Sequence, residues 1–140
     1  MVKARNIRLH LGVVVARDEQ AIKIRKPLAD MEQLKLRVFG ALRDASDFLV
    51  EHSPRVVIVD YQLCGAAGVY ALAELMSCCE CPIILITRDV SDWELEQFKE
   101  LGVMAVLGSR FHIEELCSKV ELALKFGEQL GSSGRLPAVS

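Results

Sequence analysis

The chain has 140 residues, enough for one domain with a full hydrophobic core and too few for two domains of ordinary size. Its composition, 51% hydrophobic and 26% charged, is typical of a globular protein. Its net charge of −2 argues against direct nucleic-acid binding by this segment, because phosphate binding needs clustered Lys and Arg. No apolar run approaches the roughly 18 residues of a membrane span, and Arg8 and His10 interrupt the N-terminal apolar stretch, which argues against a signal peptide. The five cysteines, an odd number without a framework spacing, predict free thiols in a reducing cytoplasm.

The first part of the chain predicts two strands with a helix between them. An apolar-rich stretch over residues 7–16 predicts the first strand. Asp18 and Glu19 suit the start of the following helix, where acids interact favourably with the helix dipole, and Pro27 is expected to kink or shorten that helix. Its apolar stripe comprises Ala21, Ile24, Leu28 and Met31. Residues 34–39 alternate between apolar and polar and predict the second strand.

The third predicted strand is the centre of the sequence. Four β-branched residues at 56–59 run directly into Asp60, a pattern typical of a strand buried on both faces of a parallel sheet. In such sheets ligands bind outside the carboxyl ends of the strands, so Asp60 lies where an α/β domain usually carries its functional groups. A short helix over residues 42–51 is predicted before this strand, and a loop with Gly65 and Gly68 after it.

The remainder of the chain repeats this alternation. The predicted elements are a helix over residues 67–77, a strand over 83–87, a helix over 92–100, a strand over 103–107 and a long helix from 113. In the helix over 92–100, Leu95 and Phe98 share a face with Leu101, the residue directly after it, and this face is expected to be the inner one. Strict alternation of five strands and five helices predicts an α/β fold with a parallel sheet covered by helices on both faces. We place the domain at residues 1–128 and expect 129–140 to be a linker or a disordered tail.

Two groups of residues suggest other kinds of site. Cys78, Cys79 and Cys81 lie close in sequence, but a closed zinc site usually needs four ligands and no histidine is near, so we interpret them as small residues between a helix and a strand. The three histidines are far apart, and we find neither a nucleophile–His constellation nor a nucleotide-binding glycine motif. We therefore do not expect an enzyme.

The spaced polar positions resemble the receiver domain of two-component response regulators over about residues 7–126. Four positions match the family: Asp60 stands at the phosphoacceptor, Gly68 follows it eight positions later, Thr87 ends the fourth strand, and Gly102 precedes the fifth. Two short runs match in part. Arg17-Asp18-Glu19 stands where the family has Asp-Asp-Glu, and Ser109-Arg110-Phe111 stands where it has Lys-Pro and an aromatic residue. The resemblance implies a flavodoxin-like (βα)5 fold, doubly wound, with strand order 2-1-3-4-5.

The resemblance also implies a role for each site residue. Asp60 would accept a phosphoryl group from a histidine kinase, and Thr87 would be the switch hydroxyl that binds a phosphoryl oxygen. Mg²⁺ would neutralise the added charge, held by Asp18, Asp60 and the backbone carbonyl of Gln62. Ser109 stands at the position of the family's lysine, where a neutral hydroxyl cannot pair with a phosphoryl group in the same way.

Departures from the family pattern put phosphorylation and Mg²⁺ binding in doubt. Arg17 replaces the first acid, and Arg88, Cys64, Arg110 and Val106 replace residue types that the family usually has near the site. Two hypotheses stay open. The arginines at 17, 88 or 110 take over neutralisation of the anion, since guanidinium suits phosphate. Alternatively, Arg17 pairs with Asp60 and locks the pocket without a metal.

A surface of apolar residues suggests a partner. Trp93 lies off the inner face of its helix, and Leu122 and Phe126 form a second stripe on the last helix. The alternative is that Trp93 folds over a neighbouring helix. We expect an atypical receiver that acts as an interaction module, forms a homodimer through its fourth helix, fifth strand and fifth helix, and controls an output domain, by family analogy a transcriptional one. The alternative is a receiver switched by phosphotransfer to Asp60.

Overall fold

The computed structural model describes residues 9–133, with side chains described up to Phe126. The elements are β1 (His10–Val15), α1 (Asp18–Ala29), β2 (Leu34–Phe39), α2 (Leu42–Glu51), β3 (Val56–Asp60), η2 (Tyr61–Ala67), α3 (Val69–Met76), β4 (Ile83–Thr87), α4 (Asp92–Leu101), β5 (Ala105–Gly108) and α5 (Ile113–Ser133). η2 is a 3₁₀ segment, and the other helices are α-helices. The alternation of strands and helices is the one that the sequence predicts.

The five strands form one parallel sheet in the order β2-β1-β3-β4-β5, which confirms the predicted topology. Parallel neighbours need crossover connections, and the helices supply them. The register pairs Asp60 of β3 with Ile86 of β4, and Thr87 of β4 with Gly108 of β5. The carboxyl ends of these strands therefore meet at one edge of the sheet, and Arg17 lies at the same edge because it follows β1.

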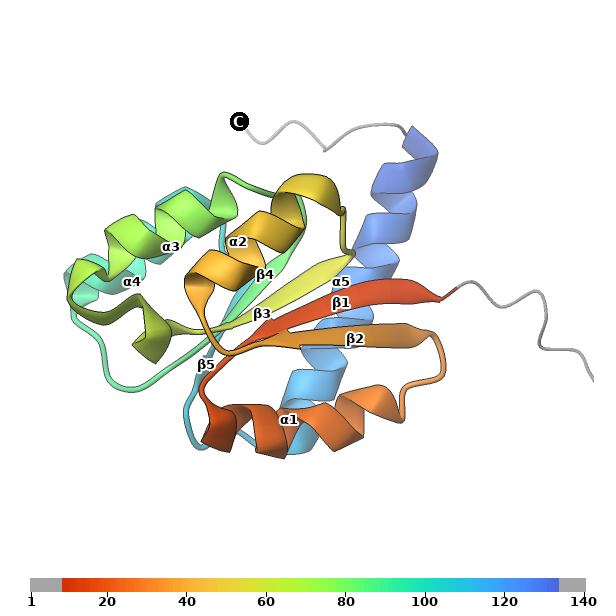
Figure 1. The fold of residues 1–140 in the computed structure, drawn as a ribbon, viewed down its shortest axis with the longest axis horizontal. Coiled ribbons are helices and arrows are strands. Elements are labelled where there is room, and N and C mark those ends of the chain that lie inside the picture. The colour runs from red at the N-terminus through yellow and green to blue at the C-terminus, as the bar shows by residue number, and fades with distance from the viewer. Residues whose placement is uncertain (1–8, 134–140) are drawn as a thin grey trace, which may run out of the picture.

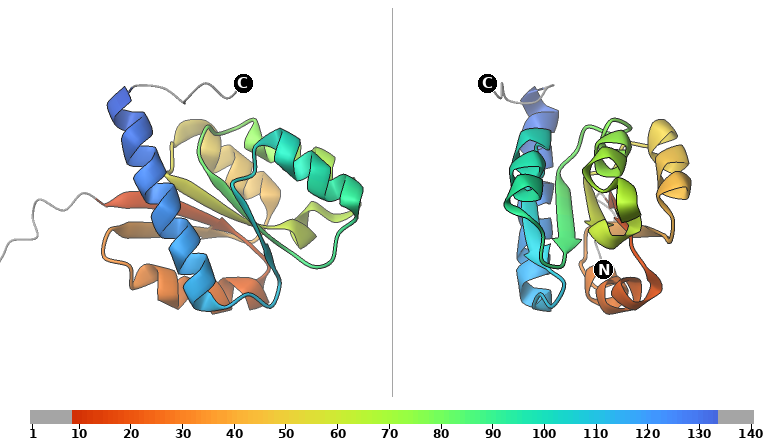
Figure 2. Two further views of the ribbon diagram at one scale, coloured as in Figure 1. Left: turned by 180° about the vertical axis from the view of Figure 1, so that it is seen from behind. Right: turned by 90° about the vertical axis from the view of Figure 1, so that its left-hand side faces the viewer.

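Helices cover both faces of the sheet, as predicted. One buried cluster joins the strands to α1 and α5, and a second joins them to α2, α3 and α4. In Figure 1, α2 and α3 lie in front of the strands and α5 lies behind them. The back view in Figure 2 brings α5 in front of the sheet. The sheet is thus the middle of three layers.

The central strands β3 and β4 are buried along their whole length. Strands with both faces covered carry apolar residues without alternation, and each fully buried Val or Ile contributes about 1.5–3 kcal/mol to stability. Only Asp60 and Thr87, the last residue of each strand, interrupt the apolar run. Both polar side chains lie at the edge where the sheet carries its candidate site.

The two edge strands are less covered. β2 exposes Lys35 and Arg37 between more buried apolar residues, as its alternating sequence predicts. β5 has four residues, and the side chain of Val106 is 39% exposed. Neither strand is enclosed on both sides in the way that β3 and β4 are.

Helix α5 extends beyond residue 128, where we placed the end of the domain. α5 continues to Ser133, so residues 129–133 are helical. Small polar residues suggested a helix end there, but an established helix gains a backbone hydrogen bond with each residue added. Residues 134–140, the rest of the predicted tail, lie outside the described residues.

Two helix boundaries also differ from prediction. The segment after Asp60 forms η2 rather than an irregular loop, and α3 begins at Val69. Gly65 and Gly68 have φ values of 58° and 52°, a region that favours glycine; Gly65 lies at a kink inside η2, and Gly68 directly follows its end. Pro27 lies inside α1, two residues before the helix ends at Ala29.

The predicted inner face of α4 is wrong for one residue. Phe98 is buried, whereas Leu95 is 42% exposed. The reason is the position of α4. This helix packs against α3, whereas on its other side the Val106 side chain of β5 is itself exposed and does not cover Leu95. Within residues 9–133, no helix is long and apolar enough to cross a membrane.

Candidate functional site

The candidate site is built from the carboxyl ends of three neighbouring strands. β3 ends at Asp60, β4 ends at Thr87, and Ser109 directly follows β5. Arg17 lies between β1 and α1, at the N-cap position of that helix. The parallel register brings these four residues to one edge, although up to 92 positions separate Arg17 and Ser109 in sequence. The sequence prediction that these positions form one site is therefore consistent with where the fold places them.

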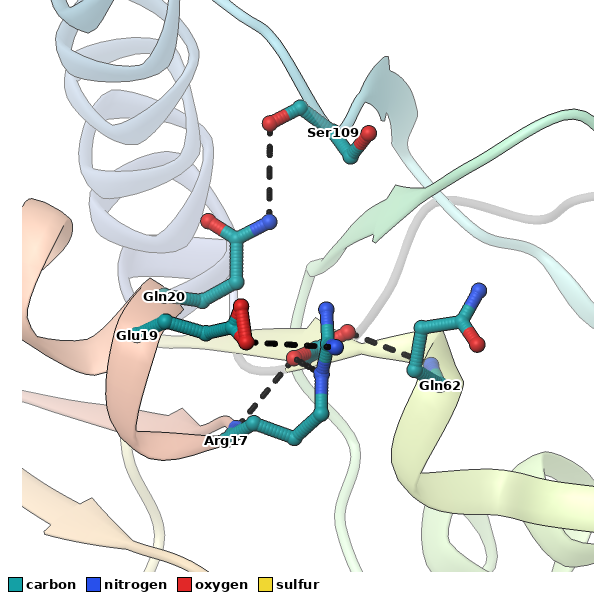
Figure 3. A network of polar contacts seen from close by, with 6 residues as sticks. Arg17, Glu19, Gln20, Gln62 and Ser109 are labelled. Carbon is teal, nitrogen blue, oxygen red and sulfur yellow. Dashed lines mark hydrogen bonds and ion pairs between the residues drawn. The ribbon is translucent and has the colours of Figure 1, made fainter.

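Asp60 is buried, with 1% of its surface exposed, and both of its carboxylate oxygens accept hydrogen bonds. Arg17 Nε donates to Oδ2 at 2.8 Å, and the backbone N–H of Arg17 donates to the same oxygen at 3.2 Å. The backbone N–H of Gln62 donates to Oδ1 at 3.2 Å. Figure 3 shows the Arg17 and Gln62 contacts converging at the end of the strand. The ionised carboxylate is thus satisfied by one cation and two backbone donors.

Arg17 is the cation of this site. Its side chain is 28% exposed and also lies 3.8 Å from the Glu19 carboxylate through its Nη1 atom. The hydrogen bond to Asp60 raises the pKa of Arg17, and the charges of Asp60 and Glu19 add to that effect. A guanidinium that touches a buried carboxylate neutralises it without any metal. The geometry matches the hypothesis in which Arg17 pairs with Asp60.

The residues present fit a Mg²⁺ centre poorly. In the described part of the chain, no three His, Cys, Asp or Glu side chains are arranged to hold a metal ion, and this includes the three clustered cysteines. Asp18 is exposed in the first turn of α1, and Arg17 rather than Asp18 is the N-cap residue. The Arg17 guanidinium already contacts one of the two Asp60 carboxylate oxygens. A second positive charge at this carboxylate would be repelled.

Thr87 and Ser109 have different surroundings. The Thr87 side chain is 4% exposed, and its Oγ1 has no hydrogen-bond partner. The backbone carbonyl of Ser109 accepts from Gln20 Nε2 at 3.5 Å and from Lys23 Nζ at 3.4 Å. Figure 3 shows the Gln20 side chain extending toward Ser109. Lys23 Nζ also lies 3.9 Å from the centre of the Phe111 ring, a cation–π contact.

Gln20 and Lys23 are residues that the sequence alone did not single out. They follow Arg17 at intervals of three, which places all three side chains on one side of α1. That spacing was the available signal, but their partner Ser109 lies 89 and 86 positions away. Receiver domains carry a lysine ammonium at the position of Ser109, and this chain has none there. Instead, the Lys23 ammonium lies at the backbone carbonyl of Ser109.

A second polar network links the site to α4. Tyr61, directly after Asp60, donates from its hydroxyl to Glu94 Oε2 at 2.8 Å. Glu94 also closes a capping box with Ser91 at the start of α4. Burial and the hydrogen bond to Glu94 raise the pKa of Tyr61, while the Ser91 backbone N–H and then the Tyr61 hydroxyl lower the pKa of Glu94. The Tyr61 ring packs edge-on against Phe98 at 5.0 Å.

The predicted interaction residues are exposed. Trp93 is 55% exposed, and Leu122 and Phe126 on α5 are 54% and 40% exposed. Leu95 on α4 and Val106 on β5 are exposed apolar side chains of the neighbouring elements. About half of the Trp93 surface is therefore accessible to a partner.

Comparisons with known proteins identify the fold. No family model matches the chain. A signal receiver domain of a modulated diguanylate cyclase from Desulfovibrio desulfuricans G20 superposes with a TM-score of 0.72 at 24% identity, covering 86% of this chain and 98% of that one. A signal receiver domain from Vibrio parahaemolyticus gives 0.77 at 20% identity over 90% and 97%. A CheY-like receiver domain from Methanospirillum hungatei JF-1 gives 0.75 at 14% identity over 86% and 98%. The chain therefore has the fold of the response-regulator receiver domains.

Proposed function

We propose that this chain is an atypical receiver domain whose phosphorylation site is replaced by an internal ion pair. The observation that carries the proposal is the 2.8 Å hydrogen bond from Arg17 Nε to a buried Asp60 oxygen. The guanidinium stands where the family has an acid, and it supplies the positive charge that Mg²⁺ would otherwise supply. The domain then acts as a constitutive signalling and interaction module rather than as a phosphorylation switch.

The contacts around Ser109 support the same proposal. A lysine at this position would pair with a phosphoryl group on Asp60, whereas the Ser109 carbonyl is bound by Gln20 and Lys23. Arg17, Gln20 and Lys23 therefore connect α1 to the ends of β3 and β5 without any ligand. Because the charge of Arg17 is already paired with Asp60, this arginine is not free to bind a phosphoryl group.

The exposed apolar side chains support an interaction role. Leu122 and Phe126 on α5, with Val106 on β5 and Leu95 on α4, offer apolar surface that a second copy of the chain would cover. We propose a homodimer through α4, β5 and α5, and a role in controlling an output domain, transcriptional by analogy with the family. The proposed localisation is cytoplasmic, with no membrane partner.

One observation favours the alternative function, a receiver phosphorylated by a histidine kinase. Thr87 Oγ1 is buried without a hydrogen-bond partner, and a phosphoryl oxygen on Asp60 is the partner that the family mechanism would give it. For this function Arg17 would have to leave Asp60 and bind the phosphoryl group, with Mg²⁺ held by Asp18, Asp60 and the Gln62 carbonyl. The ion pair makes that rearrangement costly.

Intact mass spectrometry after incubation with Mg²⁺ and acetyl phosphate separates the two functions. The proposal expects no phosphoryl adduct on the natural chain, and no change of Trp93 fluorescence with Mg²⁺ and beryllofluoride. An adduct that disappears in Asp60→Asn would support the alternative and contradict the proposal.

A gain-of-function variant is the positive control. Arg17→Asp with Ser109→Lys restores the family's acid and lysine, and we expect it to form an adduct that depends on both Mg²⁺ and Asp60. Arg25→Asp with Ser109→Lys has the same charge change, but Arg25 lies on an exposed part of α1. That control should form no adduct.

A further inference from the structure

A groove opens between α4 and β5 next to the candidate site. Its volume is about 980 Å³, and its lining includes Thr87, Arg88, Leu95, Val106, Ser109 and Arg110. It exists because α4 leaves the outer face of β5 uncovered, so that Leu95 and Val106 remain exposed on its two sides. Sites for small molecules commonly have volumes of roughly 300–1,000 Å³.

Four polar side chains that line this groove have unsatisfied hydrogen-bonding groups. Among the described residues, neither Arg88 nor Arg110 makes a hydrogen bond or an ion pair, and the Ser109 hydroxyl makes no hydrogen bond. Thr87 Oγ1 is buried and unsatisfied, although nearly all buried polar atoms in native proteins have a partner. Arg17 differs from these arginines, because its charge is already paired with Asp60.

The charge and shape of the groove select a class of ligand. Its lining carries two arginines against one acid, Asp89, so its formal charge is +1. Guanidinium groups bind phosphate oxygens in pairs of parallel hydrogen bonds. The remaining lining is largely apolar and includes Val90 and Leu107 as well as the exposed Leu95 and Val106. A ligand with a phosphate-type anion and a flat apolar body matches both parts.

We infer that the groove between α4 and β5 binds a small aromatic molecule that carries a phosphate-type anion. The anion contacts Arg88 and Arg110, and the flat body covers Leu95 and Val106. This inference goes beyond the proposed function and does not rest on it, because it requires neither phosphorylation of Asp60 nor dimerisation. A bound ligand would cover part of the surface proposed for self-association.

The test uses 8-anilinonaphthalene-1-sulfonate, a fluorescent aromatic sulfonate, with the full chain. We expect one saturable site per chain, from which phenyl phosphate displaces the dye and neutral phenol does not. Arg88→Gln with Arg110→Gln should weaken dye binding about tenfold or more, since each charge-assisted hydrogen bond is strong. Equal displacement by phenol would overturn the inference.

A matched variant controls for net charge. Arg25→Gln with Arg43→Gln removes two exposed arginines on α1 and α2, away from the groove lining, and should leave dye affinity unchanged. An equal loss of affinity in this control, or none in the groove variant, would also overturn the inference. Asp60→Asn should bind the dye normally, which separates this result from the outcome for the proposed function. Methyl NMR shifts at Leu95 and Val106 on dye binding would locate the site.

Discussion

At the scale of single residues, Asp60 is the feature that organises the site. A carboxylate with 1% exposure costs several kcal/mol to leave uncompensated, and here Arg17 and two backbone N–H groups compensate it. The two carboxylate oxygens of Asp60 are therefore both hydrogen-bonded by groups of the chain itself. The position has the residue type of the receiver domains' phosphoacceptor, and its contacts here are those of an ion pair.

The ion pair predicts a stability change in Arg17→Met. The variant keeps the long apolar part of the side chain and removes the charge, so the free energy of unfolding should fall by about 1–3 kcal/mol in urea denaturation. Arg25→Met, at an exposed position on the same helix, should change it by less than about 0.5 kcal/mol. Equal effects of the two substitutions would show that the pair with Asp60 contributes nothing specific.

Cys64 gives a second prediction at this scale. Burial, with a smaller contribution from the Asp60 charge, raises the pKa of its thiol to about 11. The reactive thiolate is therefore scarce at pH 8, and the side chain is only 5% exposed. Iodoacetamide at pH 8 should leave Cys64 unmodified in the folded protein and modify it in urea, as read by peptide mass spectrometry. Rapid labelling in the folded state would contradict this placement.

At the scale of elements, the capping box of α4 connects that helix to β3. Glu94 accepts from the Ser91 backbone and from the Tyr61 hydroxyl, and Tyr61 follows Asp60 directly. The N-terminus of α4 is thus held by a residue one position from the site carboxylate. A change in the backbone at the end of β3 would act on α4 through this contact.

Glu94→Gln tests whether the charge of Glu94 contributes to the stability of the fold, because that contribution should depend on pH. The pKa of Glu94 is lowered from 4.5 in the folded state, so its ionised form stabilises the fold above about pH 4.5, and this stability is lost as the pH falls through the folded pKa. The variant should therefore be less stable than the natural chain at pH 7, by about 0.3–1 kcal/mol, with a difference that shrinks below pH 4.5. Thermal unfolding at both pH values measures this. A difference independent of pH would show that the charge of Glu94 is not involved.

Element types were predictable from the sequence because β3 and β4 are continuous apolar runs and amphipathic helices separate the strands. The end of α5 was not predictable, since small polar residues suit both a linker and an exposed helical turn. The exposure of Leu95 was also missed, because helical spacing gives the apolar face of α4 but not how far its neighbours extend over it.

At the scale of the whole molecule, strand order brings distant residues to one edge. The resemblance assigned Asp60, Thr87 and Ser109 to one site, and the parallel register brings the ends of their strands together. The contacts of Gln20 and Lys23 with Ser109 were beyond prediction, because no local pattern relates a helix in the first quarter of the chain to a loop near its end.

The proposed dimer predicts a change in assembly at this scale. Leu122→Ser with Phe126→Ser removes apolar surface from α5, so the variant should be monomeric at concentrations where the natural chain is dimeric by size-exclusion chromatography with light scattering. Ile22→Ser with Tyr70→Ser changes side chains that are 76% and 74% exposed on α1 and α3, and should leave the dimer intact. A natural chain that stays monomeric at high concentration would contradict the proposed interface.

The alternation of β2 has a consequence for how copies of this protein can meet. The edge of a sheet presents unpaired backbone groups that can template the addition of another strand and start aggregation. Lys35 and Arg37 are exposed on this edge strand, and charged residues there oppose such addition. The opposite edge, β5, is only four residues long. Continuous sheets across molecules are thus disfavoured at both edges, so copies of the chain would associate through side-chain surfaces rather than by adding strands.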